Sequence, residues 1–393
     1  MRTVPLSLPP EMTMTHGRNI AVFCIIFIHT VATLWIIKDF GGISTNNLDG
    51  GSLGHTPFTR NQPKLRFQWT SLELHSKLAK VMHTHQHNCS VPVAAHRFRS
   101  SYGPQGPENS RNYGLGSELH VWGHLALLAR NKGVRIRTTP RLDWSWWDHD
   151  TCNGTASSSL LACYFPHAET SKCLDETLDD DATKISSSSL CGPQFGETLS
   201  VSEERMALTE YLFASVSPLV VHEATKQLQL VFPNGTVPAN LITIHIRWGD
   251  KETEMQLKSI TTYIEAAKKI VAEKQIDTVN ILLCTEDPKA TVAFYSQIPK
   301  DWNVYLDQFY TYMLPFRSEN SSYNALGDIS MQVLMGKAGL WALGSLLVSM
   351  EANIFILTTK SNWSRLMNEL RLGIVNPRCN NCTIMVDLGY GEC

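Results

Sequence analysis

The sequence predicts an α/β protein whose C-terminal part is built around a parallel sheet of Rossmann type. After residue 240, short apolar runs typical of buried strands alternate with segments of helical periodicity. Strands and helices that alternate along a chain form βαβ units, in which neighbouring strands are parallel. The composition agrees, because 43% of the 393 residues are hydrophobic and 18% are charged, as in an ordinary globular protein of about two or three domains. The net charge of −2 shows no basic excess, so we expect no nucleic-acid partner.

The first element is an uncharged apolar run, residues 20–37, which predicts one transmembrane helix behind a cytosolic tail, residues 1–19. At about 1.5 Å per residue the run spans roughly 27 Å, enough for a thin bilayer. Arg2 and Arg18 precede it and only Glu11 opposes them, so the positive-inside rule places the N-terminus in the cytosol. A cleaved signal peptide and a buried core helix are the alternatives. The pattern favours a single-pass membrane protein of type II with a luminal body.

Two further counts agree with an oxidising lumen. Acceptors for N-glycosylation stand at Asn88, Asn153, Asn234, Asn320, Asn362 and Asn381. Nine of the ten cysteines lie outside the apolar run, and most of them cluster. The clusters, which predict disulfides within local loops, are Cys152, Cys163, Cys173 and Cys191, and then Cys379, Cys382 and Cys393. Because nine is odd, at least one thiol lacks an intramolecular partner, and Cys284, inside an apolar strand pattern, is the candidate for a buried free cysteine.

Residues 38–110 lack a globular pattern and predict a stem rich in Gly, Ser, Asn, His and Pro. Residues 72–82 are its one candidate for a short amphipathic helix. His83, His85 and His87, followed by Cys89, have side chains that can bind a metal, but a spacing of two places the histidines on one side only in an extended chain. A solvated histidine-rich linker is the interpretation that we favour.

Folded elements are predicted from residue 111 onward. Gly114 and Gly116 form a turn that opens a helix over residues 118–131, followed by a strand over residues 134–138. A glycine turn at a helix start can present backbone N–H groups to a phosphate, although a simple tight turn explains it equally well.

The remaining elements follow from hydrophobic periodicity and from the positions of proline. Residues 151–200 are rich in Cys, Ser and Asp and predict a disulfide-tied or partly disordered insertion. Pro218 is expected to kink a helix, and Pro288 to begin one. We expect strands at residues 241–246, 279–284 and 353–357, and helices at residues 203–230, 260–273, 288–295, 330–349 and 361–372.

Polar side chains follow the first of these strands, at the edge where a sheet of this type binds its ligands. His245 and Arg247 project the same way, and Asp250, Lys251 and Glu254 come shortly after. An arginine in this place can bind a pyrophosphate through two parallel hydrogen bonds. Structural ion pairing is the alternative.

The other two strand ends are also polar. Glu286 and Asp287 follow the second strand and could accept from a base or ribose, or could cap the next helix. A run from Thr358 to Arg365 follows the third, and its hydroxyls and backbone N–H groups at a helix start can hold phosphate.

These segments together resemble the α-1,6-fucosyltransferase family. The matching pieces are Ile244-His245-Ile246-Arg247-x-x-Asp250-Lys251, Thr285-x-Asp287-Pro288, the Thr/Ser turn ending at Arg365, and Gly-x-Gly-Ser-Glu-Leu-His ending at His120. They lie in residues 110–150 and 240–372, about half of the chain. The resemblance implies a GT-B-like fold of two Rossmann-like domains, residues 111–235 and 236–393, on a type II Golgi membrane protein. It also implies transfer of fucose from GDP-fucose to the innermost N-acetylglucosamine of N-glycans, with inversion and without a metal.

The resemblance further implies roles for single residues. Arg247 would bind the donor pyrophosphate, and Glu254 would be the general base, assisted by Lys251. Asp287 would lie near the guanosine and Tyr263 near the donor. The substrate-binding set that it implies is His245, Arg247, Asp250, Tyr263, Asp287, Ser361, Asn362, Gly114 and Gly116, with donor GDP-fucose, an N-glycan on a glycoprotein as acceptor, and no further cofactor.

Three departures from the family pattern bear on these roles. Trp248 stands where the family has a second arginine, and Gly344, or Ser345 in a shifted alignment, stands where it has an aspartate that contacts the guanine. The chain ends at Cys393 without the SH3-like domain of animal members, so animal-type acceptor recognition is not expected. Another fucosyltransferase of the same fold, such as a protein O-fucosyltransferase, and a membrane-tethered glycan-binding protein without catalysis are the rival functions.

Overall fold

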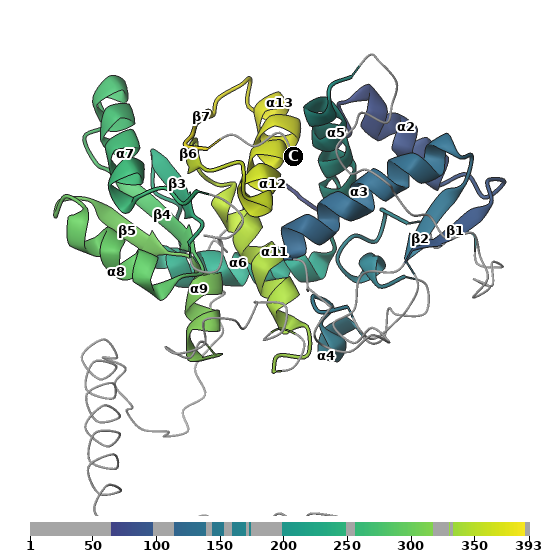
Figure 1. Cartoon of the computed structure of the whole chain (residues 1–393), viewed down its shortest axis with the longest axis horizontal. Helices are drawn as coiled ribbons and strands as arrows, with labels where there is room; N and C mark the ends of the chain where they lie inside the picture. The colour runs from purple at the N-terminus through teal and green to yellow at the C-terminus, as the bar shows by residue number, and fades with distance from the viewer. Residues whose placement is uncertain are drawn as a thin grey trace, which may run out of the picture. The chain divides into compact units, whose positions relative to one another are not determined.

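The predicted parallel sheet is present in the computed structural model. Its strands are β3 (Leu241–Ile246), β4 (Asn280–Thr285), β5 (Asn303–Leu306), β6 (Ile354–Leu357) and β7 (Ile384–Asp387). β3, β4 and β5 lie on the left-hand side of Figure 1. They lie in the order β5-β4-β3-β6-β7, and all neighbouring pairs are parallel. β4 and β5 are added on one side of β3, and β6 and β7 on the other. The order of strand addition thus reverses between β3 and β6, and their carboxyl ends form the topological switch point. The α/β class is therefore confirmed, while β5 and β7 were not predicted.

The structure describes residues 64–96, 114–138, 144–152, 159–169, 173, 199–248, 256–316, 330 and 333–389. All of them belong to one unit, residues 61–393. The predicted cytosolic tail and transmembrane helix lie outside the described residues. Within those ranges, every helix falls short of the length and apolarity that crossing a membrane requires.

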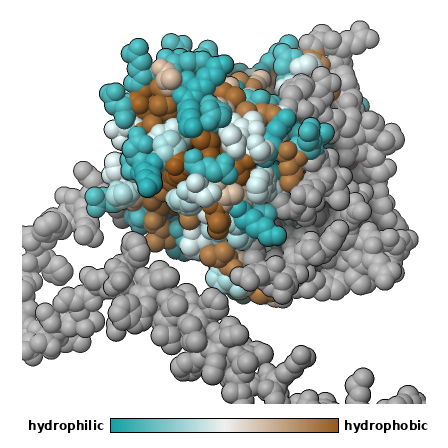
Figure 2. Space-filling view, turned by 60° about the vertical axis from the view of Figure 1, so that its left-hand side comes forward, coloured by the Kyte–Doolittle hydropathy of each residue, from teal (hydrophilic) through white to brown (hydrophobic). Residues whose placement is uncertain are grey.

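Helices cover both faces of the sheet. Side chains alternate along the strands, so Ile242 and Ile244 of β3 pack with α7 (Ile260–Lys274) and α8 (Pro288–Gln297). Leu241, together with Leu282 and Phe355 of the neighbouring strands, belongs to the core on the opposite face. That face is covered by α6 (Pro218–Val231), α9 (Gln308–Met313), α11 (Lys337–Ser349) and α12 (Asn362–Leu370). Figure 2 brings the α7 and α8 side forward and shows hydrophilic residues over much of it, with hydrophobic residues between them.

A smaller parallel pair precedes this sheet. β1 (Val93–His96) pairs with β2 (Arg135–Thr138), and α3 (Leu115–Asn131) lies between them in the sequence. α2 (Lys77–Gln86) and α5 (Val201–Phe213) pack with α3. The predicted helix and strand at the start of the first domain are confirmed within a few residues.

The prediction that residues 38–110 form a stem is wrong for residues 64–96. Trp69 is fully buried, and α2 buries Leu78 and Met82 against the rest of the fold. The predicted amphipathic helix exists, but it begins at Lys77 after the capping residue Ser76. The few buried side chains of this segment stand among polar and small residues, so the sequence pattern did not indicate that the segment contributes to the core. Residues 38–63 and 97–110 lie outside the described residues.

The predicted kinked helix over residues 203–230 is in fact two helices. α5 ends at Phe213, and α6 begins at Pro218, with Ser217 as its N-cap. Proline is favoured at the first helical position because its missing N–H has no intrahelical partner there. The connection between the helices instead bonds to the N-terminal segment, where Val216 N donates to Trp69 O over 3.0 Å. The residues between α5 and α6 thus bond to the segment around Trp69 and do not continue the helix.

Other boundaries also differ from the predictions. α11 begins at Lys337 rather than at residue 330, after Gly336, whose φ of 82° favours glycine. After α12, the helical path continues as a π-helical turn, Arg371–Val375, and then α13 (Asn376–Arg378). Short helical segments lie at His149–Cys152, Leu161–Cys163, Pro233–Gly235 and Leu314–Phe316.

Two of the disulfides are local, as predicted, and one is not. Cys152–Cys163 and Cys379–Cys382 join residues 11 and 3 positions apart. Cys89–Cys173 joins residues 84 positions apart and ties the end of α2 to the insertion, so the expectation of local pairing is wrong for Cys173. Cys284 is buried and free, which confirms that prediction. Cys191 and Cys393 lie outside the described residues.

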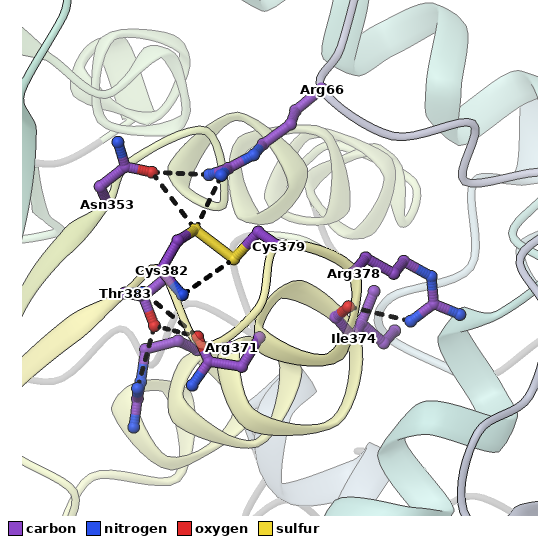
Figure 3. The surroundings of a disulfide bond; sticks show 9 residues. Arg66, Asn353, Arg371, Ile374, Arg378, Cys379, Cys382 and Thr383 are labelled. Atoms are coloured by element: carbon purple, nitrogen blue, oxygen red, sulfur yellow. Dashed lines mark hydrogen bonds between the residues drawn. A yellow bond between two sulfur atoms is a disulfide. The ribbon is translucent and has the colours of Figure 1, made fainter.

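The Cys379–Cys382 disulfide lies beside Arg66, a residue of the predicted stem (Figure 3). Arg66 Nη1 donates to Asn353 Oδ1 over 2.7 Å, and Nη2 donates to Cys382 Sγ over 2.9 Å. These contacts join the N-terminal segment to the amino end of β6.

The histidine-rich segment belongs to α2 rather than to a linker. In a helix, His83 and His85 point in different directions; His83 stacks on His87 at 4.1 Å instead. Cys89 is used in a disulfide. Among the described residues there is no cluster of His, Cys, Asp and Glu that could hold a metal ion.

Candidate functional site

The candidate site lies at the carboxyl ends of β3 and β6, where the strand order reverses. β3 is followed by Arg247, and β6 by the turn from Thr358 to Ser361 that begins α12. Because the two strands are parallel neighbours, their ends meet at one edge of the sheet.

His245 is buried within this edge and is neutral. Its Nδ1 lies 2.6 Å from the hydroxyl of Ser364, in the first turn of α12. Burial, helped by the charge of Arg247, lowers the pKa of His245 to about 3. A neutral imidazole can donate or accept but carries no charge toward a ligand. His245 therefore links β3 to α12, and Arg247 is the cation of this strand end.

Arg247 forms an ion pair with Glu286, which follows the neighbouring strand β4. The two side chains are only 15% and 17% exposed. Ligand binding and ion pairing were the two sequence-based interpretations of this strand end, and the ion pair is present. A guanidinium has five N–H donors, more than one carboxylate accepts, so a pair with Glu286 is compatible with contact to a phosphate.

Asp287 is the N-cap of α8. Its Oδ1 accepts from Lys289 N over 2.7 Å and from Ala290 N over 3.3 Å. Of the two interpretations of this residue, capping is the one that the contacts support. Asp287 thus stands one strand away from the β3–β6 edge, with its carboxylate bonded to its own helix.

The turn after β6 is held from two sides. Tyr263, from the first turn of α7, is 1% exposed, and its hydroxyl lies 2.8 Å from Thr358 Oγ1. Asp387, at the end of β7, accepts from Thr359 N over 3.0 Å and pairs with the Thr359 hydroxyl. The sequence pattern did not single out Asp387, because β7 lacks a strong strand signal and ends near the C-terminus.

The N-termini of two helices meet beside this turn. Ser361 is the N-cap of α12 and Gly114 that of α3, and neither supplies a side-chain cap. The amide of Asn362 donates to Ser117 Oγ over 2.7 Å. A Cβ on Gly116 would lie 3.4 Å from the backbone oxygen of Asn362, so this glycine permits close approach of the helices. Uncapped N–H groups and the positive ends of two helix dipoles favour an anion here.

The structure therefore brings together six of the predicted residues: His245, Arg247, Tyr263, Ser361, Asn362 and Gly116. Gly114 precedes α3 in the same region. Asp250, Lys251 and Glu254 lie outside the described residues. Their segment begins after Trp248, whose indole N–H donates to Lys258 O over 2.9 Å. Trp248, in the place of a second arginine, thus links the described residues on either side of this segment.

An aspartate at Gly344, as in the family pattern, would require the side chains of Gln227 and Glu223 to move. A Cβ there would lie 2.8 Å from Gln227 Nε2 and 2.9 Å from Glu223 Cγ, because α11 packs closely on α6. A carboxylate is nevertheless present nearby, since Asp307, after β5, accepts a hydrogen bond from Ser345. Burial raises the pKa of Asp307 to about 6. Asp307 was not predicted as a site residue, because β5 was not predicted.

No protein-family model matches the sequence, and no curated protein matches it either. Among solved structures, the fucosyltransferase NodZ from Bradyrhizobium aligns with a TM-score of 0.35 and 12% identity, over 71% of this chain and 93% of that one. Crystal structures of POFUT1, one in the apo form and one in complex with GDP, align with TM-scores of 0.27 at 9% and 10% identity. Each of these two alignments covers 48% of this chain and 50% of the POFUT1 chain. The aligned part thus spans about half the length of POFUT1 in each structure.

Proposed function

We propose that the protein is a fucosyltransferase that uses GDP-fucose as donor. The observation that carries this proposal is that Arg247, directly after β3, and the N-terminus of α12, which Ser361 does not cap with its side chain, both lie at the switch point of the sheet. A guanidinium and backbone N–H groups are the donors that a pyrophosphate requires. The polar strand ends and their resemblance to the α-1,6-fucosyltransferase family support a sugar nucleotide, and in particular GDP-fucose.

The proposed reaction is a direct displacement with inversion. The acceptor hydroxyl attacks the anomeric carbon of fucose, and the bond from that carbon to the β-phosphate oxygen breaks. Glu254 takes the hydroxyl proton, with assistance from Lys251. Arg247 and the N–H groups at the start of α12 stabilise the negative charge that develops on the departing GDP.

The finer parts of the proposal concern the acceptor and the compartment. We propose the innermost N-acetylglucosamine of N-glycans as acceptor, with an α-1,6 linkage, on a type II Golgi membrane protein whose catalytic part is luminal. The disulfides are consistent with an oxidising compartment. The apolar run at residues 20–37 and the family resemblance support the anchor.

Release of GDP from GDP-fucose by the purified luminal fragment, with a panel of N-glycan and protein acceptors, tests the function. Release that depends on an N-glycan, and on GDP-fucose among several sugar nucleotides, is the expected result. Release that depends on a protein acceptor instead would identify a protein O-fucosyltransferase. Glycan binding without any GDP release would identify a glycan-binding protein and contradict the proposal.

Arg247→Ala is expected to reduce turnover of GDP-fucose about a hundredfold or more, because the leaving pyrophosphate loses its cation. Arg247→Lys keeps the charge but not the two-pronged geometry, so an intermediate loss is expected. Lys274→Ala removes an exposed cation from the far end of α7 and serves as the matched control. Normal turnover in Arg247→Ala would show that this residue does not bind the donor phosphates.

A further inference from the structure

A histidine of α3 connects the first turn of α12 with the last. His120 Nδ1 lies 3.3 Å from Asn362 Oδ1, and its Nε2 lies 2.9 Å from Glu369 Oε2. The side chains of His120 and Glu369 are only 12% and 6% exposed. Because Asn362 is the first residue of α12, this one ring fixes the helix start that carries the proposed phosphate contacts.

The orientation of the Asn362 amide is determined by its other partners. Arg365 Nη1 donates to Asn362 Oδ1 over 3.1 Å, and a guanidinium can only donate. On the other side, Asn362 Nδ2 donates to Ser117 Oγ. The atom that faces His120 Nδ1 is therefore an oxygen, which can only accept.

Glu369 is an acceptor as well. Its Oε2 also accepts from Thr209 Oγ1 of α5 over 2.7 Å. A glutamate is ordinarily a carboxylate at neutral pH, and the hydrogen bond that Oε2 accepts from Thr209 fits that state.

Both ring nitrogens of His120 consequently face acceptors, so both must donate. Only the doubly protonated imidazolium has two N–H donors. Either neutral tautomer would direct a nitrogen lone pair at the oxygen of Asn362 or of Glu369. Of the charged groups around this cluster, Glu369 contacts the ring, Arg365 of α12 contacts its other partner Asn362, and Arg205 of α5 interacts with Glu369.

We propose that His120, as an imidazolium, is a positioning residue for the donor site. This inference rests on the proposed function. Loss of the Nδ1 proton forces the Asn362 amide to turn, and its NH2 group then faces the donating guanidinium of Arg365. Three hydrogen bonds at the start of α12 depend on this one proton: those to His120, Arg365 and Ser117. The same residues join α3 to α12, so the proton also holds the two helix N-termini together.

The protonation state itself can be measured without any ligand. Nitrogen NMR of the histidine rings, assigned with His120→Gln, reports whether each ring nitrogen carries a proton. The spectrum is recorded at about pH 6.5, within the range of roughly pH 5–8 in which histidine can change its charge. Both ring nitrogens of His120 are expected to carry a proton. A neutral tautomer at that pH would overturn the proposal.

Binding of GDP to the full chain, measured by calorimetry from about pH 5.5 to pH 8.5, tests the effect on the site. Affinity of the wild type is expected to be about tenfold lower at the alkaline end of this series than at the acid end, because the contacts at the start of α12 that depend on the Nδ1 proton are lost. His120→Gln is expected to bind weakly at all these pH values, with a flat profile. His222→Gln, on α6 and outside this cluster, is the control and should keep the wild-type profile.

Glu369→Gln provides a second variant of nearly unchanged size. Without the carboxylate the imidazolium is less stable, so the fall in GDP affinity should move to lower pH.

Thermal unfolding measured over the same pH series separates a role in positioning the donor site from a role in stabilising the fold. A lowered melting temperature with a wild-type pH profile of GDP binding in both variants would mean that the cluster is only structural. If the wild type binds no GDP at any pH, the proposed function fails as well, whereas GDP binding with an unaltered profile in His120→Gln overturns the positioning role alone.

Discussion

Several residues at the strand ends have structural partners in addition to their expected ligand. His245 bonds to Ser364, and Arg247 pairs with Glu286. A polar group at such a buried edge needs partners in the ligand-free protein, since burying it without hydrogen bonds is costly. Asn362 illustrates the consequence, because its amide is engaged on both sides and a glycan on its side chain would break the bond to Ser117. Its sequon is therefore not expected to carry one.

Asp307 makes stability depend on pH in a defined direction. Its pKa is raised to about 6, above the ordinary 3.8, by burial. The folded state thus holds a proton that the unfolded state has released between about pH 4 and pH 6, so this residue's contribution to stability falls as pH rises through that window. Asp307→Asn stays neutral and can still accept from Ser345.

The variant is expected to lose this part of the pH dependence and to be more stable than the wild type at pH 7. Urea unfolding of both proteins at pH 4, 5, 6 and 7 measures the difference. Asp301→Asn, an exposed neighbour in the sequence, is the control. A stability difference between Asp307→Asn and the wild type that does not change over this range would contradict the buried, protonated state.

At the scale of the elements, helix starts position the site. α7, α8 and α12 each begin after one strand of the sheet, and their first turns carry Tyr263, the carboxylate cap and Ser364. The caps differ in kind, since Asp287 satisfies the N–H groups of α8 with its own side chain, whereas Ser361 does not do so for α12. The helix without a cap is the one whose N-terminus can receive an anion from outside.

The capping role of Asp287 can be separated from a role in binding guanosine. Asp287→Asn retains a good N-cap, so its free energy of unfolding should stay close to that of the wild type, whereas Asp287→Ala should lose about 1 kcal/mol. If Asp287 only caps α8, GDP affinity in Asp287→Asn is unchanged. A large loss of GDP affinity in Asp287→Asn, at unchanged stability, would instead show that its charge contacts the nucleotide.

At the scale of the whole molecule, long-range links join segments whose sequences look unstructured. Residues 64–96 supply α2 and β1 and are fixed by the bond between Trp69 and Val216, by the contacts of Arg66 and by the Cys89–Cys173 disulfide. A long loop closed by a disulfide restricts the unfolded chain more than a short one does.

Removal of the Cys89–Cys173 pair by alanine is expected to cost about 4–5 kcal/mol of stability in the loop-entropy account. Removal of Cys152–Cys163, which closes a much shorter loop, should cost about 3 kcal/mol. Denaturant unfolding of the two double variants measures both values. Equal losses, or a larger loss for the shorter loop, would mean that native packing rather than loop closure sets the contribution.

The sequence by itself determined the three inner strands of the main sheet and which strand ends carry the candidate site. Buried parallel strands are continuous apolar runs, so residues 241–246 were found with their full bounds. The places of His245, near the end of this strand, and of Arg247, directly after it, follow from position alone. The caps of α8 and the free, buried Cys284 were also within reach of local pattern. These features depend on neighbours in sequence, which is why periodicity and capping chemistry could predict them.

Only the tertiary structure decided how these pieces are joined. Asp387 reaches Thr359 across 28 positions, and Glu369 reaches His120 across 249, and no local pattern records such pairs. The two short strands at the sheet edges, β5 and β7, gain their structure from pairing with a neighbour rather than from their own hydrophobicity. The protonation of His120 is of the same kind, because it follows from acceptors that the chain brings together only when it folds.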